Sequence, residues 1–294
     1  MTHRLKSCRL AAMAAVLAGP TAAAEPFNLG YVEFNEKSSN QLSNIGCFKT
    51  QPSGKPFFTH ASIFAANIKD DEQGGPRIFY NAKTADLLDR SSQVADLQRQ
   101  GIRVLLSILG GSKQNGWTCY SQPAAAAQLA NRIAAEVQRY GFDGIDIDEE
   151  YTACPPQKAS LTLVATALKA DPRFAGKWLS KALFRDAPYF ATTPAGPSLG
   201  RLLDRGWEMS YWTQDAGSRL NPYLQWGLDK DRLGLGIDLG KAPALIEAQA
   251  RSAKAWGTGG LMLYNVMKTS QAALSTVATA QSGQTVVADP ACLR

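Results

Sequence analysis

The amino-acid sequence predicts an α/β fold in which eight parallel strands alternate with helices and close into a barrel. Short apolar segments of strand type recur at intervals of roughly 30 residues, as expected for a strand followed by a helix. Their number, eight, favours closure of the sheet. No glycine-rich phosphate loop follows the first strand, which argues against the rival interpretation, a doubly wound open sheet. We therefore expect a single (β/α)8 TIM barrel.

The first half of the chain contains four predicted strands and three predicted helices. The strands are short apolar or alternating segments of the kind that a parallel sheet buries: residues 27–34, 61–67, 102–109 and a segment within 141–151. The helices repeat apolar residues on one face: residues 84–100, 123–140 and 157–170. They end at Gly101, Gly141 and Asp171-Pro172. Residues 35–59 are polar and show little helical periodicity.

The second half repeats this pattern less regularly. Four more strands are predicted at residues 178–184, 207–212, 233–239 and 259–265. Helices are predicted after the last two strands, at residues 242–256 and 269–281. The segments after the fifth and sixth strands are short and rich in Pro and Gly, so we expect short or missing helices there. No linker or low-complexity segment divides residues 25–294, which are expected to form one domain.

The first 24 residues have the pattern of a secretory signal peptide. Basic residues precede an apolar run from Leu10 to Gly19 that is too short to span a bilayer, and Ala22-Ala23-Ala24 is a small-residue cleavage site. Cleavage after about Ala24 would give a secreted or periplasmic protein. It would remove three of 31 basic residues and none of 25 acidic ones, so the formal charge of +6 becomes +3. We expect a monomer. We also expect that the protein binds neither nucleic acid nor membrane, because no basic cluster and no later long apolar run is present.

The mature chain would retain four cysteines, an even number that predicts two disulfides in an oxidising compartment. Four cysteines allow three pairings, and the sequence alone does not choose between them. Cys119 and Cys154 would lie in neighbouring loops of the barrel, so we favour the pairs Cys119–Cys154 and Cys47–Cys292. No C-x-x-C or histidine pairing supports the alternative, a zinc site.

His60 is the only histidine after the signal peptide. This excludes Ser-His-Asp and Cys-His catalysis and multi-histidine metal sites in their usual forms. Catalysis must then depend on carboxylates and tyrosines, and we expect neither a metal nor a cofactor.

The most informative stretch, residues 141–151, reads Gly-Phe-Asp-Gly-Ile-Asp-Ile-Asp-Glu-Glu-Tyr. Two isoleucines alternate with Asp146, Asp148 and Glu150, and this period of two places the three carboxylates on one face of a strand. The alternative is a solvated acidic face, but the amphipathic helix before the strand indicates that its outer face is covered. We therefore expect the carboxylates to line a pocket. Coupled carboxylates that retain a proton at neutral pH are what glycosidic bond cleavage requires.

Asp143-Gly144-x-Asp146-x-Asp148-x-Glu150 resembles the D-G-x-D-x-D-x-E signature of glycoside hydrolase family 18. Two other family motifs have similar segments in this chain. Leu-Leu-Ser-Ile-Leu-Gly-Gly at residues 105–111 resembles the S-x-G-G motif with one inserted residue, and it contains Ser107, Gly110 and Gly111. Met209-Ser210-Tyr211 resembles the M-x-Y motif, but Trp212 follows where the family has Asp or Asn.

The resemblance extends from about residue 28 to 280 and is strongest to bacterial endo-β-N-acetylglucosaminidases of the endoglycosidase H type. It rests further on residues 31–35, 63–68, 104–110, 140–151 and 263–265. It implies hydrolysis of the β-1,4 bond in the N,N′-diacetylchitobiose core of N-linked glycans, with an N-glycan or an N-acetylglucosamine-containing oligosaccharide as substrate. The alternatives are a chitinase or another N-acetylglucosamine-oligomer hydrolase and, less favoured because Glu150 is present, a non-catalytic glycan-binding barrel. A third alternative is a hydrolase that binds a metal through the acidic strand.

The resemblance also implies a substrate-assisted mechanism, in which the acetamido group of the substrate is the nucleophile. Glu150 would be the general acid and base, Asp148 would hold the acetamido N–H, and Asp146 would share a proton with Asp148. Tyr211 would donate to the acetamido carbonyl oxygen. Asp143, on the opposite phase of the strand, would be structural.

Substrate-binding residues are expected where strands end, because active sites of such barrels lie at the carboxyl ends of the strands. The aromatic members of this set would stack on sugar faces. The set comprises Phe34, Asn35, Asn67, Trp117, Tyr151, Trp212, Tyr264 and Asn265.

Overall fold

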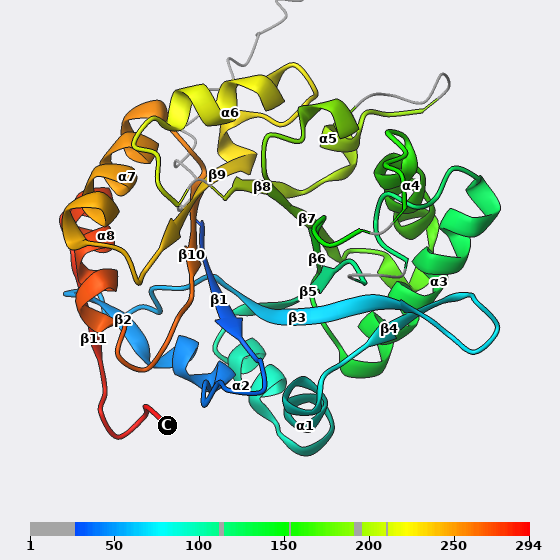
Figure 1. The fold of residues 1–294 in the computed structure, drawn as a ribbon. Helices are drawn as coiled ribbons and strands as arrows, with labels where there is room; N and C mark the ends of the chain where they lie inside the picture. Colours follow the sequence, from blue (N-terminus) through cyan, green and yellow to red (C-terminus); the bar gives the residue numbers. More distant parts are fainter. Residues whose placement is uncertain (1–26, 112–114, 153, 191–195, 210) are drawn as a thin grey trace, which may run out of the picture.

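A computed structural model describes residues 27–111, 115–152, 154–190, 196–209 and 211–294 (Figure 1). Eight parallel strands follow one another around a barrel in the order β1-β10-β9-β8-β7-β6-β5-β3, and pairing of β1 with β3 closes it. The predicted (β/α)8 barrel is therefore confirmed. Its strands are β1 (Phe27–Glu33), β3 (His60–Asp70), β5 (Arg103–Leu109), β6 (Gly144–Asp148), β7 (Trp178–Leu183), β8 (Arg205–Glu208), β9 (Leu233–Asp238) and β10 (Gly260–Tyr264).

The helices surround the barrel in Figure 1. They are α1 (Ala82–Arg90), α2 (Gln93–Arg99), α3 (Pro123–Tyr140), α4 (Ser160–Ala170), α5 (Leu199–Leu202), α6 (Ala216–Leu224), α7 (Pro243–Trp256) and α8 (Gln271–Ser282). Short 3-10 helices are η1 (Leu42–Cys47), η2 (Pro172–Phe174), η3 (Ala187–Phe190) and η4 (Lys230–Arg232). Three strands lie outside the barrel: β4 (Pro76–Phe79) pairs antiparallel with β3, and β2 (Phe48–Gln51) pairs with β11 (Thr285–Ala288).

The structure corrects two of the predicted elements. The helix expected at residues 84–100 is divided into α1 and α2 by Ser91 and Ser92, and the Ser91 hydroxyl donates to the Leu87 carbonyl at 2.7 Å. Serine hydroxyls that bond to the backbone compete with helix continuation. The polar stretch 35–59 contains η1 and β2, which lack a periodic apolar pattern. The expectation of short helices after the fifth and sixth strands agrees with α5, of four residues, and α6, of nine.

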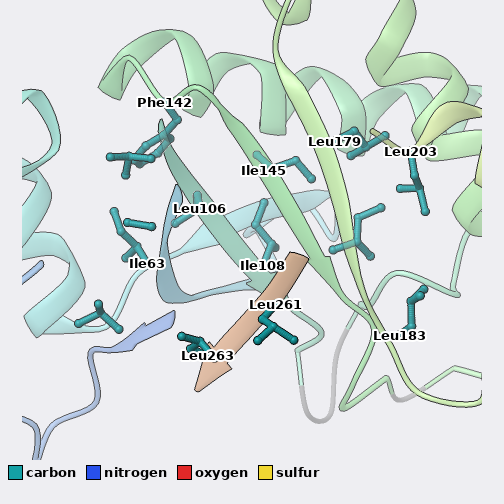
Figure 2. Packing of buried hydrophobic residues seen from close by; sticks show 14 of the residues in the cluster. Ile63, Leu106, Ile108, Phe142, Ile145, Leu179, Leu183, Leu203, Leu261 and Leu263 are labelled. Carbon is teal, nitrogen blue, oxygen red and sulfur yellow. The ribbon is translucent and has the colours of Figure 1, made fainter. Parts of the chain in front are cut away.

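Alternation along the strands separates two cores. Outward-facing residues pack against the helices, as Figure 2 shows for Leu106, Ile108 and Ile145. Inward-facing residues fill the barrel, and their smaller apolar cluster includes Phe27, Leu29, Tyr31, Leu105, Ala182, Trp207, Met209 and Met262. The same alternation places Asp146 and Asp148 inside the barrel, because their neighbours in β6 face outward.

Both favoured disulfides, Cys119–Cys154 and Cys47–Cys292, are present. The first joins the loops that follow β5 and β6, next to the acidic strand. No helix in the described part of the chain is long and apolar enough to cross a membrane. The predicted signal peptide, residues 1–24, lies outside the described residues.

Candidate active site

The acidic strand brings three carboxylates to the carboxyl end of the barrel. Asp146 and Asp148 are buried in β6, whereas Glu150 is half-buried and lies just beyond the strand. The strand ends two residues earlier than expected, because the Glu150 N–H turns back to donate to the Asp148 carbonyl at 3.0 Å. We call Asp146, Asp148 and Glu150 the acidic column.

Asp146, the deepest member, is surrounded by hydroxyl donors. Ser180 donates to Oδ1 at 2.6 Å, Ser107 donates to Oδ2 at 3.4 Å, and Tyr31 also donates to Oδ2. The Trp207 indole N–H donates to the Tyr31 hydroxyl at 3.0 Å. Burial raises the pKa of Asp146 to about 6, although the hydroxyl donors oppose this rise.

Asp148 has a different environment. It is only 2 % exposed, and its Oδ1 has no hydrogen-bond partner among the residues described. Burial raises its pKa well above the usual range, and the neighbouring charges of Glu150 and Asp146 raise it further. A buried acceptor without a donor is costly, so Asp148 is prepared either to retain a proton or to accept a hydrogen bond from a ligand.

Two tyrosines lie across the site from the acidic column. The rings of Tyr211 and Tyr264 have centroids 5.7 Å apart. Burial raises the pKa of Tyr211 well above its usual value, as does the charge of Asp148, so Tyr211 remains a phenol that can donate. It follows β8, which ends at Glu208 and is shorter than the predicted strand at 207–212.

Glu33 at the end of β1 is a site residue that the sequence analysis missed. Its carboxylate accepts hydrogen bonds from Asn35 at 2.6 Å, Asn265 at 2.8 Å and Tyr264 at 3.3 Å. Three predicted substrate-binding residues are therefore gathered around one acid. The signal was present in the sequence, because Glu33 shares the strand phase of the inward-facing Tyr31.

Two predicted substrate-binding residues require correction. Phe34 is 5 % exposed and Trp117 is fully buried, and both belong to the outer core. Phe34 has the opposite strand phase from Glu33, and the Trp117 indole donates to the Ile108 carbonyl at 2.6 Å. Their rings pack against protein and are not available to stack on a sugar.

Of the remaining candidates, Tyr151 and Trp212 are well exposed, at 60 % and 61 %. The Trp212 ring packs edge-on against Phe184, with centroids 6.0 Å apart. Asn67 is half-buried and donates to the Gly110 carbonyl at 2.9 Å, which fixes the end of β5.

The motif residues around the acidic column have structural contacts. The Gly110 N–H donates to the Glu150 carbonyl at 3.0 Å, and a Cβ on Gly110 would lie 2.4 Å from that oxygen, so only glycine permits this approach. A Cβ on Gly144 would lie 2.1 Å from the Trp178 carbonyl oxygen. The Gly111 N–H donates to the Asn115 carbonyl at 2.9 Å.

Asp143 anchors the start of β6. Its Oδ2 accepts from the Val104 N–H at 2.8 Å and from Gln98 Nε2 at 2.9 Å. It makes no contact of this kind with the acidic column, in keeping with the structural role expected for it.

A second buried group of charges lies between β7, β8 and α6. Lys181 is ion-paired with Asp186, and Arg219 is ion-paired with Glu208. The Tyr223 hydroxyl lies 2.8 Å from each of the two carboxylates. We call these five residues the ion-pair cluster. The described part of the chain contains no group of three or more His, Cys, Asp or Glu side chains that could hold a metal ion.

Comparison with known proteins adds three findings. The family model for glycosyl hydrolases family 18 matches residues 29–231. An endo-beta-N-acetylglucosaminidase of Flavobacterium sp. (strain SK1022) is 34% identical over 251 residues, which cover 82% of this chain and 75% of the relative. Endo-beta-N-acetylglucosaminidase F1 of Elizabethkingia meningoseptica is 28% identical over 204 residues, 66% of this chain and 58% of that relative.

The fold also matches a solved structure. The crystal structure of Bacteroides thetaiotamicron EndoBT-3987 in complex with a Man9GlcNAc2Asn substrate aligns with a TM-score of 0.70 at 20% identity. The alignment covers 91% of this chain and 68% of that one.

Proposed function

The chain belongs to glycosyl hydrolases family 18, and we propose that it is an endo-β-N-acetylglucosaminidase that cleaves the N,N′-diacetylchitobiose core of N-linked glycans. The observation that carries this proposal is the buried Asp148 oxygen that lacks a donor, across from the Tyr211 hydroxyl. An acetamido group offers an N–H donor and a carbonyl acceptor, which matches this pair. The names of the two relatives support an endo-acting N-acetylglucosaminidase, and the Man9GlcNAc2Asn substrate in the EndoBT-3987 structure supports an N-glycan as the source of that group.

The reaction would proceed in two steps. Glu150 protonates the glycosidic oxygen as its bond to the anomeric carbon breaks, while the acetamido carbonyl oxygen of the same sugar forms a bond to that carbon. Asp148 accepts a hydrogen bond from the acetamido N–H and stabilises the positive charge of the oxazolinium ion. Tyr211 donates a hydrogen bond to the acetamido oxygen. Glu150 then removes a proton from water, and the water oxygen forms a bond to the anomeric carbon as the bond from the acetamido oxygen breaks, with overall retention of the anomeric configuration.

Asp146 would control whether the neighbouring Asp148 is charged. Two adjacent buried carboxyls cannot both ionise cheaply, so Asp146 and Asp148 share a proton over a wide pH range. The hydroxyl donors favour the ionised form of Asp146, which leaves the proton on Asp148 in the free protein. Transfer of that proton to Asp146 would free Asp148 to stabilise the cation.

Exposed groups at the rim would bind the rest of the glycan. Tyr151 and Trp212 present open rings, and Asn35, Tyr264 and Asn265 present polar groups arranged around Glu33. Asn67 lies on the same rim and completes this proposed set. We also propose that the protein is exported with removal of residues 1–24 and acts as a monomer without a cofactor.

The decisive experiment compares two substrates. Purified protein of residues 25–294 is incubated with a high-mannose glycoprotein and, separately, with chitin oligosaccharides, and the products are weighed by mass spectrometry. One N-acetylglucosamine left on each glycosylated asparagine is the expected product. Cleavage of the chitin oligosaccharides alone would show that the enzyme is a chitinase instead.

A further inference from the structure

A cavity of about 420 Å³ opens beside Glu150, among the loops that follow β6, β7 and β8. Buried residues form its floor, including Lys181, Ala182 and Met209. Exposed residues form its mouth, including Lys158, Phe184 and Arg185. Its volume is in the usual range of small-ligand sites.

The cavity lies on the leaving-group side of the proposed general acid. Under the proposed function, the reacting sugar contacts Asp148 and Tyr211, and Tyr211 packs on Tyr264 at the end of β10. The cavity lies in the other direction around the barrel, toward β7. Because Glu150 borders this cavity and would protonate the leaving oxygen, this is the space into which the leaving group would extend. That group is the protein-linked N-acetylglucosamine and the peptide around its asparagine.

Two cations at the mouth have no counterion. Lys181 on the floor is paired with Asp186, so that pair is neutral. Lys158 and Arg185, in contrast, form no hydrogen bond or ion pair with any residue that the structure describes. Unpaired cations around a cavity create a positive potential that attracts anionic partners.

The backbone is unusual on both sides of the cavity. Arg185 and Tyr151, which directly follows Glu150, are the two non-glycine residues with positive φ among the described residues, at 53° and 60°. Non-glycine residues seldom adopt this conformation, and strained residues of this kind cluster at active sites and ligand clamps. At the mouth of the cavity, Arg185 therefore has a backbone conformation that local sequence preference does not favour.

We propose that this cavity binds the aglycone and that Lys158 and Arg185 select glycopeptides with acidic residues next to the glycosylated asparagine. The inference rests on the proposed function. A guanidinium binds a carboxylate through two parallel hydrogen bonds, and an ammonium adds a second charge. Of the acids that line the same cavity, Asp186 is paired with Lys181, and burial raises the pKa of Glu149, which favours its neutral form.

The test uses two synthetic glycopeptides with the same high-mannose glycan, which differ only in having Glu or Gln on both sides of the glycosylated asparagine. The ratio of their kcat/KM values isolates the effect of charge. We expect the wild type to prefer the Glu peptide by about five- to tenfold at low ionic strength, and by less than about twofold in ~0.5 M salt, which screens exposed charges.

Three variants locate the effect. The double variant Lys158→Gln/Arg185→Gln should reduce the preference to less than about twofold, whereas Arg185→Lys keeps the charge and should retain most of it. Lys254→Gln is the matched control, because Lys254 is an exposed lysine on α7, across the barrel, and its loss should leave rate and preference unchanged.

Equal rates of the wild type on both peptides would overturn the inference and leave the proposed function intact. So would a preference that persists in the double variant or disappears in the Lys254→Gln control. If the wild type cleaves neither glycopeptide, the proposed function itself fails, and this inference fails with it.

Discussion

The acidic column and the ion-pair cluster are two buried groups of charge on neighbouring strands, and they differ in compensation. In the ion-pair cluster, two carboxylates face two cations, and a tyrosine hydroxyl lies between the carboxylates. In the acidic column, three carboxyl groups follow one another without a paired cation, and one buried oxygen has no partner in the described chain. Burial raises pKa values in both groups, but Arg219 opposes the rise at Glu208.

The comparison shows that burial alone does not identify a catalytic acid. In the ion-pair cluster each charge has its partner, so the loss of one member would leave another charge buried without compensation. The acidic column carries an uncompensated cost that a substrate can relieve. Such a cost is expected where function outweighs stability. Three predictions test this difference, a fourth tests a residue outside both groups, and they are given in order of decreasing effect.

The largest effect is expected from Glu150→Gln. Under the proposed mechanism this change removes the proton that the leaving oxygen receives, so kcat/KM on a high-mannose glycopeptide should fall by about 10²- to 10⁴-fold. Stability should barely change, because the side chain is half-buried at the rim. Activity is measured by mass spectrometry of the products, and the melting temperature by calorimetry. Near-normal turnover would remove Glu150 from its proposed role.

The second prediction concerns a change that should lower stability, in contrast to Glu150→Gln, which should lower activity. Glu208→Gln leaves Arg219 buried without its full counterion, so the free energy of unfolding should fall by about 3–5 kcal/mol. Asp148→Asn, the matched change in the acidic column, removes an uncompensated acid and should leave stability equal or higher while activity falls steeply. Chemical denaturation of both variants measures the difference. Equal loss of stability in the two variants would contradict the comparison.

The third prediction concerns pH. Because burial raises the pKa of Asp146 from 3.8 to about 6, the folded state holds a proton that the unfolded state has lost between these pH values. Stability should therefore fall as pH rises through this window, by about 3 kcal/mol for this residue. Asp148 contributes with the same sign to a higher pH, so Asp146→Asn should roughly halve the slope. Denaturation at pH 4, 5 and 6 tests this, and an unchanged slope in the variant would contradict it.

The sequence predicted the barrel and the acidic column because both depend on local patterns. Strand alternation assigned Asp146 and Asp148 to the inner face, and the confirmed family and the two disulfides agree with this pattern. The ion-pair cluster was missed because its members come from separate elements, and Lys181 and Glu208 stand in two different strands. Their partners lie in a loop and in α6, and no local periodicity connects them.

The errors at the rim have a related cause. Phe34 at a strand end and Trp117 in the loop after a strand suggested a sugar contact, but whether a ring faces the cleft or the core depends on strand phase and on loop closure. Glu33 has the inward phase and was overlooked because it stands alone in the sequence. The alternation of side chains predicted which way a residue faces as long as the strand was regular. In the loops beyond the strands, no such alternation exists and the direction could not be predicted.

The smallest effect is expected from Trp212→Ala, which touches neither group of charges. Trp212 is 61 % exposed and packs edge-on against Phe184, so its removal should change the free energy of unfolding by less than about 0.5 kcal/mol. If the ring stacks on a sugar away from the reacting bond, KM should rise by about three- to tenfold while kcat is retained, because such binding is equal in the ground and transition states. Phe184→Ala, the matched change, removes the other ring of the pair. A fall in kcat at unchanged KM would instead place Trp212 in contact with the reacting sugar, where the family carries a polar residue.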